Sequence, residues 1–153
     1  MTQPAHAHRL RTGRHSETGR AYLLTTVVRH RRPVFADLLL ARLAIAELRR
    51  CDQEGWSGTL AFVLMPEHLH WLVQMRRGTL AQLMQRFKSR SAGAINRELG
   101  HSGQKFWQAG YHDHALRDGQ DIRALARYVI TNPLRAGLVR RVGDYPHWDA
   151  VWM

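Results

Sequence analysis

The chain has 153 residues, 44% of them hydrophobic, and its 23 Lys and Arg against 12 Asp and Glu give a formal net charge of +11. This length fits one domain with a modest core, and no apolar run approaches the roughly 18 residues that a membrane helix needs. Cys51 is the only cysteine, which excludes an internal disulfide and a cysteine-based zinc site within one chain. The excess of positive charge favours a polyanion as partner, with nucleic acid first.

The first half of the chain alternates between strand and helix patterns. Residues 1–19 are polar and rich in Arg and His and are predicted to form a basic N-terminal arm. Leu and Val recur at helical spacing over residues 34–50, with Asp37 in the first turn, where a negative charge suits the helix dipole. Runs of apolar and β-favouring residues predict strands at 20–28, 59–65 and 68–75.

The second half begins with a further predicted helix, for which Thr79 is a plausible N-cap and Gly100 a natural end. A strand that Gly110 could interrupt is predicted over residues 106–116, and a last helix from Asp118 to about residue 131. Residues 20–133 are therefore expected to form the folded domain, and residues 134–153 a C-terminal tail. The order β-α-β-β-α-β-α predicts an α+β, ferredoxin-like or RRM-like fold, with a central antiparallel sheet and helices on one face.

His68 and His70 are the first candidates for chemistry. Side chains in a strand alternate between its faces, so both imidazoles are expected on one side and Leu69 on the other. Two neutral imidazoles on one face can share a divalent metal ion. The alternative is two ordinary histidines on a half-solvated strand.

Tyr128 and Asn132 are the second candidates. They are four residues apart on the last predicted helix and so lie on one stripe of it. A phenol can act as a covalent nucleophile towards phosphorus, and the Asn132 amide oxygen is a possible third metal ligand. The alternative is a packing tyrosine followed by a helix stop.

Two further groups are basic or polar. The strand segment His112-Asp113-His114 is expected to be a polar edge, with phosphate or base contact as the second interpretation and metal binding as the third. The basic side chains Arg86, Lys88 and Arg90 on the second helix are typical of a solvated face, but they could also hold a DNA backbone.

Several separated segments together resemble the REP-associated tyrosine transposases, a branch of the single-tyrosine HUH transposases. Each segment alone is a modest signal, but their order and spacing over nearly the whole chain is a strong one. The matching segments are Gly13-Arg14, GRAYLLT from Gly19, VLMPEHLH from Val63, Phe87-Lys88-Ser89 through Asn96, Phe106-Trp107-Gln108 through His114, YVITNP from Tyr128 and RAGLV from Arg135.

The resemblance implies an HUH fold and assigns roles residue by residue. The histidine pair of the motif corresponds to His68 and His70, the nucleophile to Tyr128 and the amide ligand to Asn132, where related insertion-sequence transposases commonly have Gln. These three ligands would hold Mg²⁺ or Mn²⁺, and two imidazoles suit Mn²⁺ better. The family also implies recognition of a foldback DNA hairpin with a short flanking tetranucleotide, served by the basic N-terminal arm.

The expected activity is therefore cutting and transfer of single-stranded DNA through a 5′-phosphotyrosine, in a bacterial cytoplasm and close to the nucleoid. A monomer is expected, with a dimer as the alternative. Two other functions share parts of the pattern: a non-catalytic RRM-like module that binds single-stranded nucleic acid, and a metal-dependent hydrolase that activates water. The basic residues expected to contact DNA are Arg9, Arg11, Arg14, Arg20, Arg86, Lys88 and Arg90.

Overall fold

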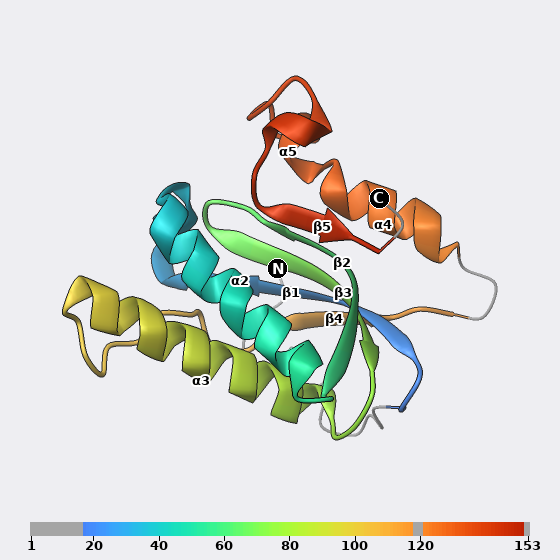
Figure 1. The fold of residues 1–153 in the computed structure, drawn as a ribbon, viewed down its shortest axis with the longest axis horizontal. Coiled ribbons are helices and arrows are strands. Elements are labelled where there is room, and N and C mark those ends of the chain that lie inside the picture. The colour runs from blue at the N-terminus through green and yellow to red at the C-terminus, as the bar shows by residue number, and fades with distance from the viewer. Residues whose placement is uncertain (1–16, 118–120, 152–153) are drawn as a thin grey trace.

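The computed structural model describes residues 17–117 and 121–151 and has a single antiparallel sheet (Figure 1). Over these residues the sheet has five strands in the order β4-β1-β3-β2-β5. They are β1 (Ala21–Val27), β2 (Ser57–Leu64), β3 (His68–Met75), β4 (His112–Ala115) and β5 (Trp148–Ala150). Each neighbouring pair is antiparallel, so the predicted α+β fold class and central antiparallel sheet are confirmed.

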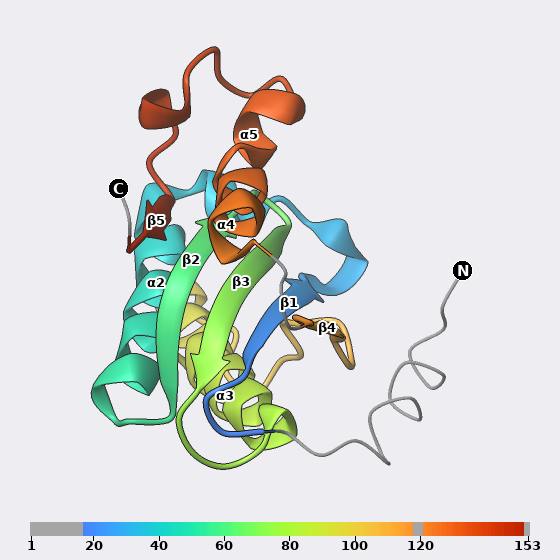
Figure 2. The same cartoon turned by 90° about the vertical axis from the view of Figure 1, so that its right-hand side faces the viewer.

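The helices cover both faces of the sheet, whereas the sequence pattern predicted helices on one face. Helices α2 (Leu38–Gln53) and α3 (Leu80–Leu99) lie side by side on one face, and α4 (Ile122–Ile130) lies across the other (Figure 2). The central strands are apolar on both sides, so each face needs a cover. No helix in the described part of the chain is long and apolar enough to cross a lipid bilayer.

Two apolar clusters on opposite faces hold these layers together. Trp71 of β3 belongs to the cluster beneath α2 and α3. Its neighbour Leu72 belongs to the other cluster, together with Ala126 and Ile130 of α4. Because alternate residues of β3 point to opposite faces, α4 packs on the same face as His68 and His70.

Local signals in the sequence define the ends of the helices. Thr79 and Gln82 form a reciprocal capping box at the start of α3, and Gly100 ends it with a left-handed φ of 72°. Asp37 accepts a hydrogen bond from the Leu40 amide and is the N-cap of α2, so this helix begins later than predicted. Residues 34–36 form a separate 3-10 turn before it.

The predicted strand over residues 106–116 is much shorter in the structure, where only β4 (His112–Ala115) is a strand. Trp107 makes a single bridge to Val28, and Gly110 then turns the chain with a φ of 77°. The ammonium group of Lys88 holds this turn by donating to the carbonyls of Gln108 and Gly110, each at 2.7 Å. The break that the sequence suggested at Gly110 is therefore present, and only residues after it form a strand.

The last helix also begins later than predicted. Its N-cap is Asp121, which accepts from the Ala124 amide at 3.1 Å. The predicted start at Asp118 lies outside the described residues.

Residues 134–151 carry more structure than the predicted tail. After the short helix α5 (Asn132–Arg135), the chain returns to the sheet as β5, which pairs with β2 in the register Ala61 to Ala150. Tyr145 is buried, and its hydroxyl donates to the Leu64 carbonyl at 2.6 Å. A strand of three residues is too short for its alternation to be recognised in sequence.

We predict that Tyr145→Phe will lower the free energy of unfolding by about 1–3 kcal/mol, because the Leu64 carbonyl would lose its partner in a buried environment. Burial raises the pKa of Tyr145 to about 12, so the phenol stays a donor at any ordinary pH. Urea unfolding measures the change. Tyr128→Phe is the matched control, because that side chain is 59% exposed and should change stability by no more than about 0.5 kcal/mol. Equal stability of the wild type and Tyr145→Phe would contradict the packing of this segment.

Candidate active site

The two histidines lie at the start of β3, which pairs with the last residues of β1. His68 is opposite Val27, and His70 is opposite Thr25. Both side chains are half-buried on the face that α4 covers. The strand therefore places the two imidazoles together, as the alternation predicted.

The imidazoles converge through their Nε2 atoms, which are 3.1 Å apart. The rings are nearly perpendicular, at 81°. Each Nδ1 has its own partner: that of His68 lies 2.5 Å from the Glu67 carboxylate, and that of His70 lies 2.9 Å from the Thr25 hydroxyl. The Glu67 carboxylate accepts from Nδ1 of His68, whereas the Thr25 hydroxyl can donate to or accept from Nδ1 of His70. With a proton on both Nδ1 atoms, the state that metal binding needs, each Nε2 would carry a lone pair.

Burial keeps both rings neutral. It is the main cause that lowers the pKa of His70 to about 4, helped by the charges of His68 and Arg135. Burial also lowers the pKa of His68, against the raising effect of Glu67. Neutral imidazoles are the form that binds metal ions.

The donor geometry fits one divalent ion. If both Nε2 atoms were bonded to an ion at about 2.1 Å, their 3.1 Å separation would correspond to an angle of roughly 95°, close to that between adjacent octahedral ligands. The described residues contain no group of three His, Cys, Asp or Glu side chains that could hold a metal.

Tyr128 lies near the end of α4, and Arg135 stacks on it. The guanidinium carbon is 3.9 Å from the centroid of the phenol ring, which is 59% exposed. Arg135 also donates to the Thr131 hydroxyl at 2.5 Å. The positive charge of the same guanidinium also contributes to lowering the pKa of His70, after burial and His68.

Asn132 is half-buried at the junction of α4 and α5. The helix stops at Thr131, with a ψ of 2°, and α5 starts at Asn132 with Pro133 in its first turn. The predicted break before Pro133 is therefore present, although a new short helix follows it. The junction places Asn132 one turn beyond Tyr128 along the segment that crosses the histidine face.

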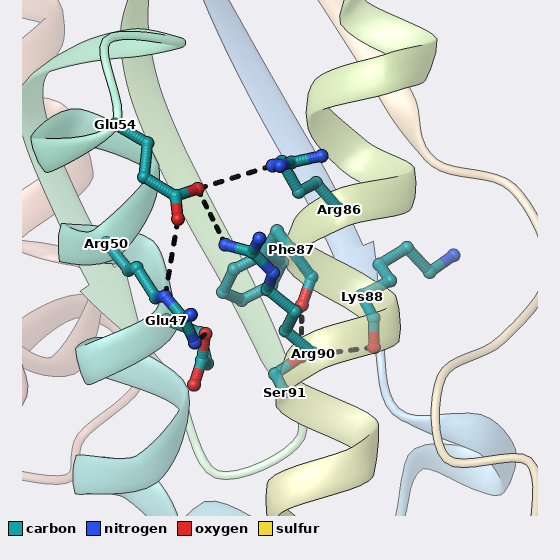
Figure 3. A network of polar contacts seen from close by, with 8 residues as sticks. All are labelled: Glu47, Arg50, Glu54, Arg86, Phe87, Lys88, Arg90 and Ser91. Atoms are coloured by element: carbon teal, nitrogen blue, oxygen red, sulfur yellow. Dashed lines mark hydrogen bonds and ion pairs between the residues drawn. The ribbon is translucent and has the colours of Figure 1, made fainter.

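The basic residues of α3 lie in the layer on the opposite face of the sheet. Glu54 accepts from Arg90 at 2.7 Å and from Arg86 at 3.3 Å, and Figure 3 shows both guanidinium groups pointing at this carboxylate. Arg50 of α2 completes the network at 3.4 Å from Glu54. Arg86 and Arg90 thus join α3 to α2, and Lys88 holds the turn described above.

The other predicted DNA contacts are not brought to the histidine pair either. Arg20 precedes β1, roughly 17 Å along the strand from Thr25, and forms an ion pair with Glu17 at 3.3 Å. Arg9, Arg11 and Arg14 lie outside the described residues.

His112 extends the site face across the sheet. His112 of β4 pairs with Thr25 of β1, and Thr25 pairs with His70 of β3. The three residues therefore form one row across neighbouring strands. His112 and His114 are exposed while Asp113 is half-buried, which agrees with a polar strand edge. Two strand spacings, about 10 Å between backbones, separate His112 from His70.

Three residues of the site had not been singled out as site residues from the sequence: Glu67, Thr25 and Arg135. Glu67 directly precedes His68, and an acidic neighbour of a candidate metal ligand was an available signal. Thr25 is recognisable only from the register between β1 and β3, 45 residues apart in sequence. Arg135 lies on α5, beyond the break before Pro133, so its stacking on Tyr128 could not be predicted from helical spacing.

Comparison with protein families now adds to this geometry. Residues 18–132 match the family model described as Transposase IS200 like. The chain belongs to the IS200-like transposase family. The matched segment contains both histidines, Tyr128 and Asn132, and membership supports a DNA transposase role.

Curated relatives and solved structures agree with this assignment. A Haemophilus influenzae protein named as a REP-associated tyrosine transposase is 25% identical over 140 residues, covering 84% of this chain and 78% of that protein. The Escherichia coli REP-associated tyrosine transposase is 33% identical over 88 residues, covering 56% of this chain and 50% of its own length. The resemblance recognised in the sequence is therefore confirmed.

Two solved structures share the fold of this IS200-like transposase. A REP-associated tyrosine transposase bound to a REP hairpin superposes with a TM-score of 0.72 at 22% identity, over 88% of this chain and 79% of the other. A Deinococcus radiodurans protein described as a transposase gives a TM-score of 0.56 at 20% identity, over 79% of this chain and 95% of the other. The HUH fold predicted from the sequence is confirmed.

We predict that His70 in metal-free protein stays neutral well below the ordinary imidazole range. Its pKa is lowered to about 4, so the unfolded chain takes up a proton near pH 6.5 while the folded protein does not. This difference costs folded stability as the pH falls from about 6.5 towards 4. NMR titration of the ring in EDTA measures the pKa directly. Protonation of His70 near pH 6.5 would contradict the buried, Thr25-anchored ring.

Proposed function

We propose that this transposase cuts and rejoins single-stranded DNA through a covalent bond between Tyr128 and a 5′ phosphate. One observation carries the proposal. The Nε2 atoms of His68 and His70 converge at 3.1 Å on the sheet face that α4 crosses, and α4 carries Tyr128, on whose exposed ring Arg135 stacks.

His68, His70 and Asn132 would hold Mg²⁺ or Mn²⁺. When bound, the ion would polarise the scissile phosphate and offset the negative charge that develops on its oxygens. Glu67 and Thr25 fix the orientation of the two rings, which keeps both Nε2 lone pairs directed at one point.

Tyr128 supplies the nucleophile. Attack of its phenol oxygen on phosphorus forms the phosphotyrosine ester and breaks the P–O3′ bond. The phenol proton is lost and the departing oxygen gains one, so a free 3′ hydroxyl results. A 3′ hydroxyl can reverse the step and reseal or transfer the strand, because one phosphate ester replaces another. Arg135 holds the ring and provides a cation beside the reacting phosphate.

The substrate that we propose is single-stranded DNA carrying a hairpin, as in REP elements. One solved structure of the same fold is bound to a REP hairpin. The net charge of +11 favours such a polyanion. We further propose that a monomer acts with its own tyrosine, since α4, which carries Tyr128, packs on the sheet face of the same chain that carries the histidine pair.

A non-catalytic RRM-like module is less well supported. Such modules stack bases on aromatic side chains of an open sheet face. Here Trp71 of the central strand is fully buried beneath α2 and α3, and the other face carries the histidines and α4.

Metal binding should depend on the groups that orient the histidines. We predict that Glu67→Gln and Thr25→Val each weaken Mn²⁺ binding by about 10- to 100-fold, because the outer partners of a metal-ligating histidine fix its tautomer and orientation. His70→Ala should abolish measurable binding. Calorimetric titration of Mn²⁺ gives the affinities, with His112→Ala as the matched control. Wild-type affinity in His70→Ala, or a loss confined to His112→Ala, would move the metal site elsewhere.

Tyr128→Phe should abolish cleavage and adduct formation while DNA and Mn²⁺ affinities stay within about twofold. The substitution removes only the attacking oxygen of a side chain that is 59% exposed. A labelled hairpin with single-stranded flanks, incubated with protein and Mn²⁺ and run on a denaturing gel, shows the covalent product as a shifted protein band. Tyr111→Phe is the matched control and should form the adduct. Cutting by Tyr128→Phe at the wild-type rate would indicate an activated water instead.

A further inference from the structure

The turn after β1 has unusual backbone geometry. The 3-10 turn η1 (Arg29–Arg31) places His30 at a φ of 61° and Arg31 at a φ of 50°. Within the described residues these are the only non-glycine residues with positive φ. Such conformations cost on the order of 1 kcal/mol or more each and persist where the surrounding structure imposes them.

Backbone hydrogen bonds impose this geometry. The Arg29 amide donates to the Phe106 carbonyl at 2.9 Å, and the Gln108 amide donates to the Val27 carbonyl at 2.8 Å. The turn is thereby fixed against the segment 105–109. Between the two lies a pocket of about 410 Å³, within the range of roughly 300–1,000 Å³ that is common for small-ligand sites.

Positive charge lines this turn pocket. Its walls are Arg29, His30, Arg31, Lys105, Trp107, Gln108 and Ala109, with no acidic residue among them. Over residues 17–117 and 121–151, the side chains of Arg29, Arg31 and Lys105 make no hydrogen bond or ion pair. They differ in this from Arg86 and Arg90, which Glu54 neutralises. Unpaired cations around a concave surface favour an anionic ligand.

The turn pocket adjoins the histidine site. Val28, which precedes the turn, donates its amide to the carbonyl of Glu67, the residue before His68, at 2.8 Å. Val27 is the direct partner of His68 in the sheet. The charge of Arg31 also contributes to lowering the pKa of His68. An anion in this pocket would therefore lie next to the proposed position of the scissile phosphate.

We propose that the turn pocket binds a backbone phosphate of the single-stranded DNA next to the scissile phosphate. Arg29 and Arg31 contact the phosphate, and Trp107 and Ala109 offer an apolar wall to the attached sugar or base. This assignment deepens the proposed function and rests on it, because it names a further contact to the same DNA. A pocket of this size suits one nucleotide of an unpaired strand, whereas the phosphates of a duplex lie on the outside of a wide rod.

The test compares two labelled DNA hairpins, one with an oligothymidine flank and one blunt. Affinity is measured by fluorescence anisotropy in EDTA, so that no cleavage occurs, over a range of salt concentrations. The variant is Arg29→Gln with Arg31→Gln, which removes both charges, keeps an unbranched polar side chain and does not make the left-handed backbone costlier. The matched control is Arg42→Gln with Arg97→Gln, which removes the same charge from exposed positions on α2 and α3. Circular dichroism confirms that each variant is folded.

We expect the turn variant to bind the flanked hairpin about tenfold more weakly and to lose about 0.7 from the salt slope, the contribution of one single-strand phosphate. Its affinity for the blunt hairpin and the affinities of the control variant should change by less than about twofold. If the turn variant bound flanked and blunt DNA with equal weakening, or with none, the pocket assignment would be overturned. Binding of the wild type to the flanked hairpin would still uphold the proposed function. Failure of the wild type to bind either hairpin would overturn both.

Discussion

The active-site geometry depends on how the two imidazoles of β3 are held by their Nδ1 atoms. Glu67 holds one and Thr25 the other, at 2.5 and 2.9 Å, so both Nε2 atoms are directed at the same point, 3.1 Å from each other. One anchor comes from the turn between β2 and β3 and the other from β1. The pairing register of the sheet is therefore part of the site, and a one-residue slip would turn both rings towards the core.

The two faces of the sheet have separate tasks. Beneath α2 and α3 lies the larger core, and there the α3 arginines are tied to Glu54 between the helices (Figure 3). The other face carries the histidines, with α4, the helix of Tyr128, packed across it. Because of this division, the basic side chains behind the net charge of +11 do not all serve to bind DNA. Cations held by a carboxylate stabilise the fold, whereas those of the turn after β1 remain available.

Much of this arrangement could be predicted from the sequence, because strand alternation and helix caps are local signals. Alternation placed His68 and His70 on one face, and the residues around Thr79 marked the start of α3. Long-range pairing was not accessible in the same way. The contact of Thr25 with His70 depends on register, and β5 is too short to have a recognisable period. The ion pair of Arg86 with Glu54 likewise depends on how α3 packs on α2. From the sequence alone, the basic residues of α3 could only be interpreted as a solvated or a DNA-binding face.

The central claim is that one divalent ion binds between the two Nε2 atoms on the face that presents Tyr128. Anomalous diffraction from crystals soaked in MnCl₂ tests it most directly. The account predicts a manganese peak about 2.1–2.2 Å from Nε2 of both His68 and His70, with the Asn132 amide oxygen as a further ligand and the Tyr128 hydroxyl on the same side of the sheet. A peak at His112 or His114 with none between His68 and His70, or a Tyr128 hydroxyl directed away from the ion, would contradict it.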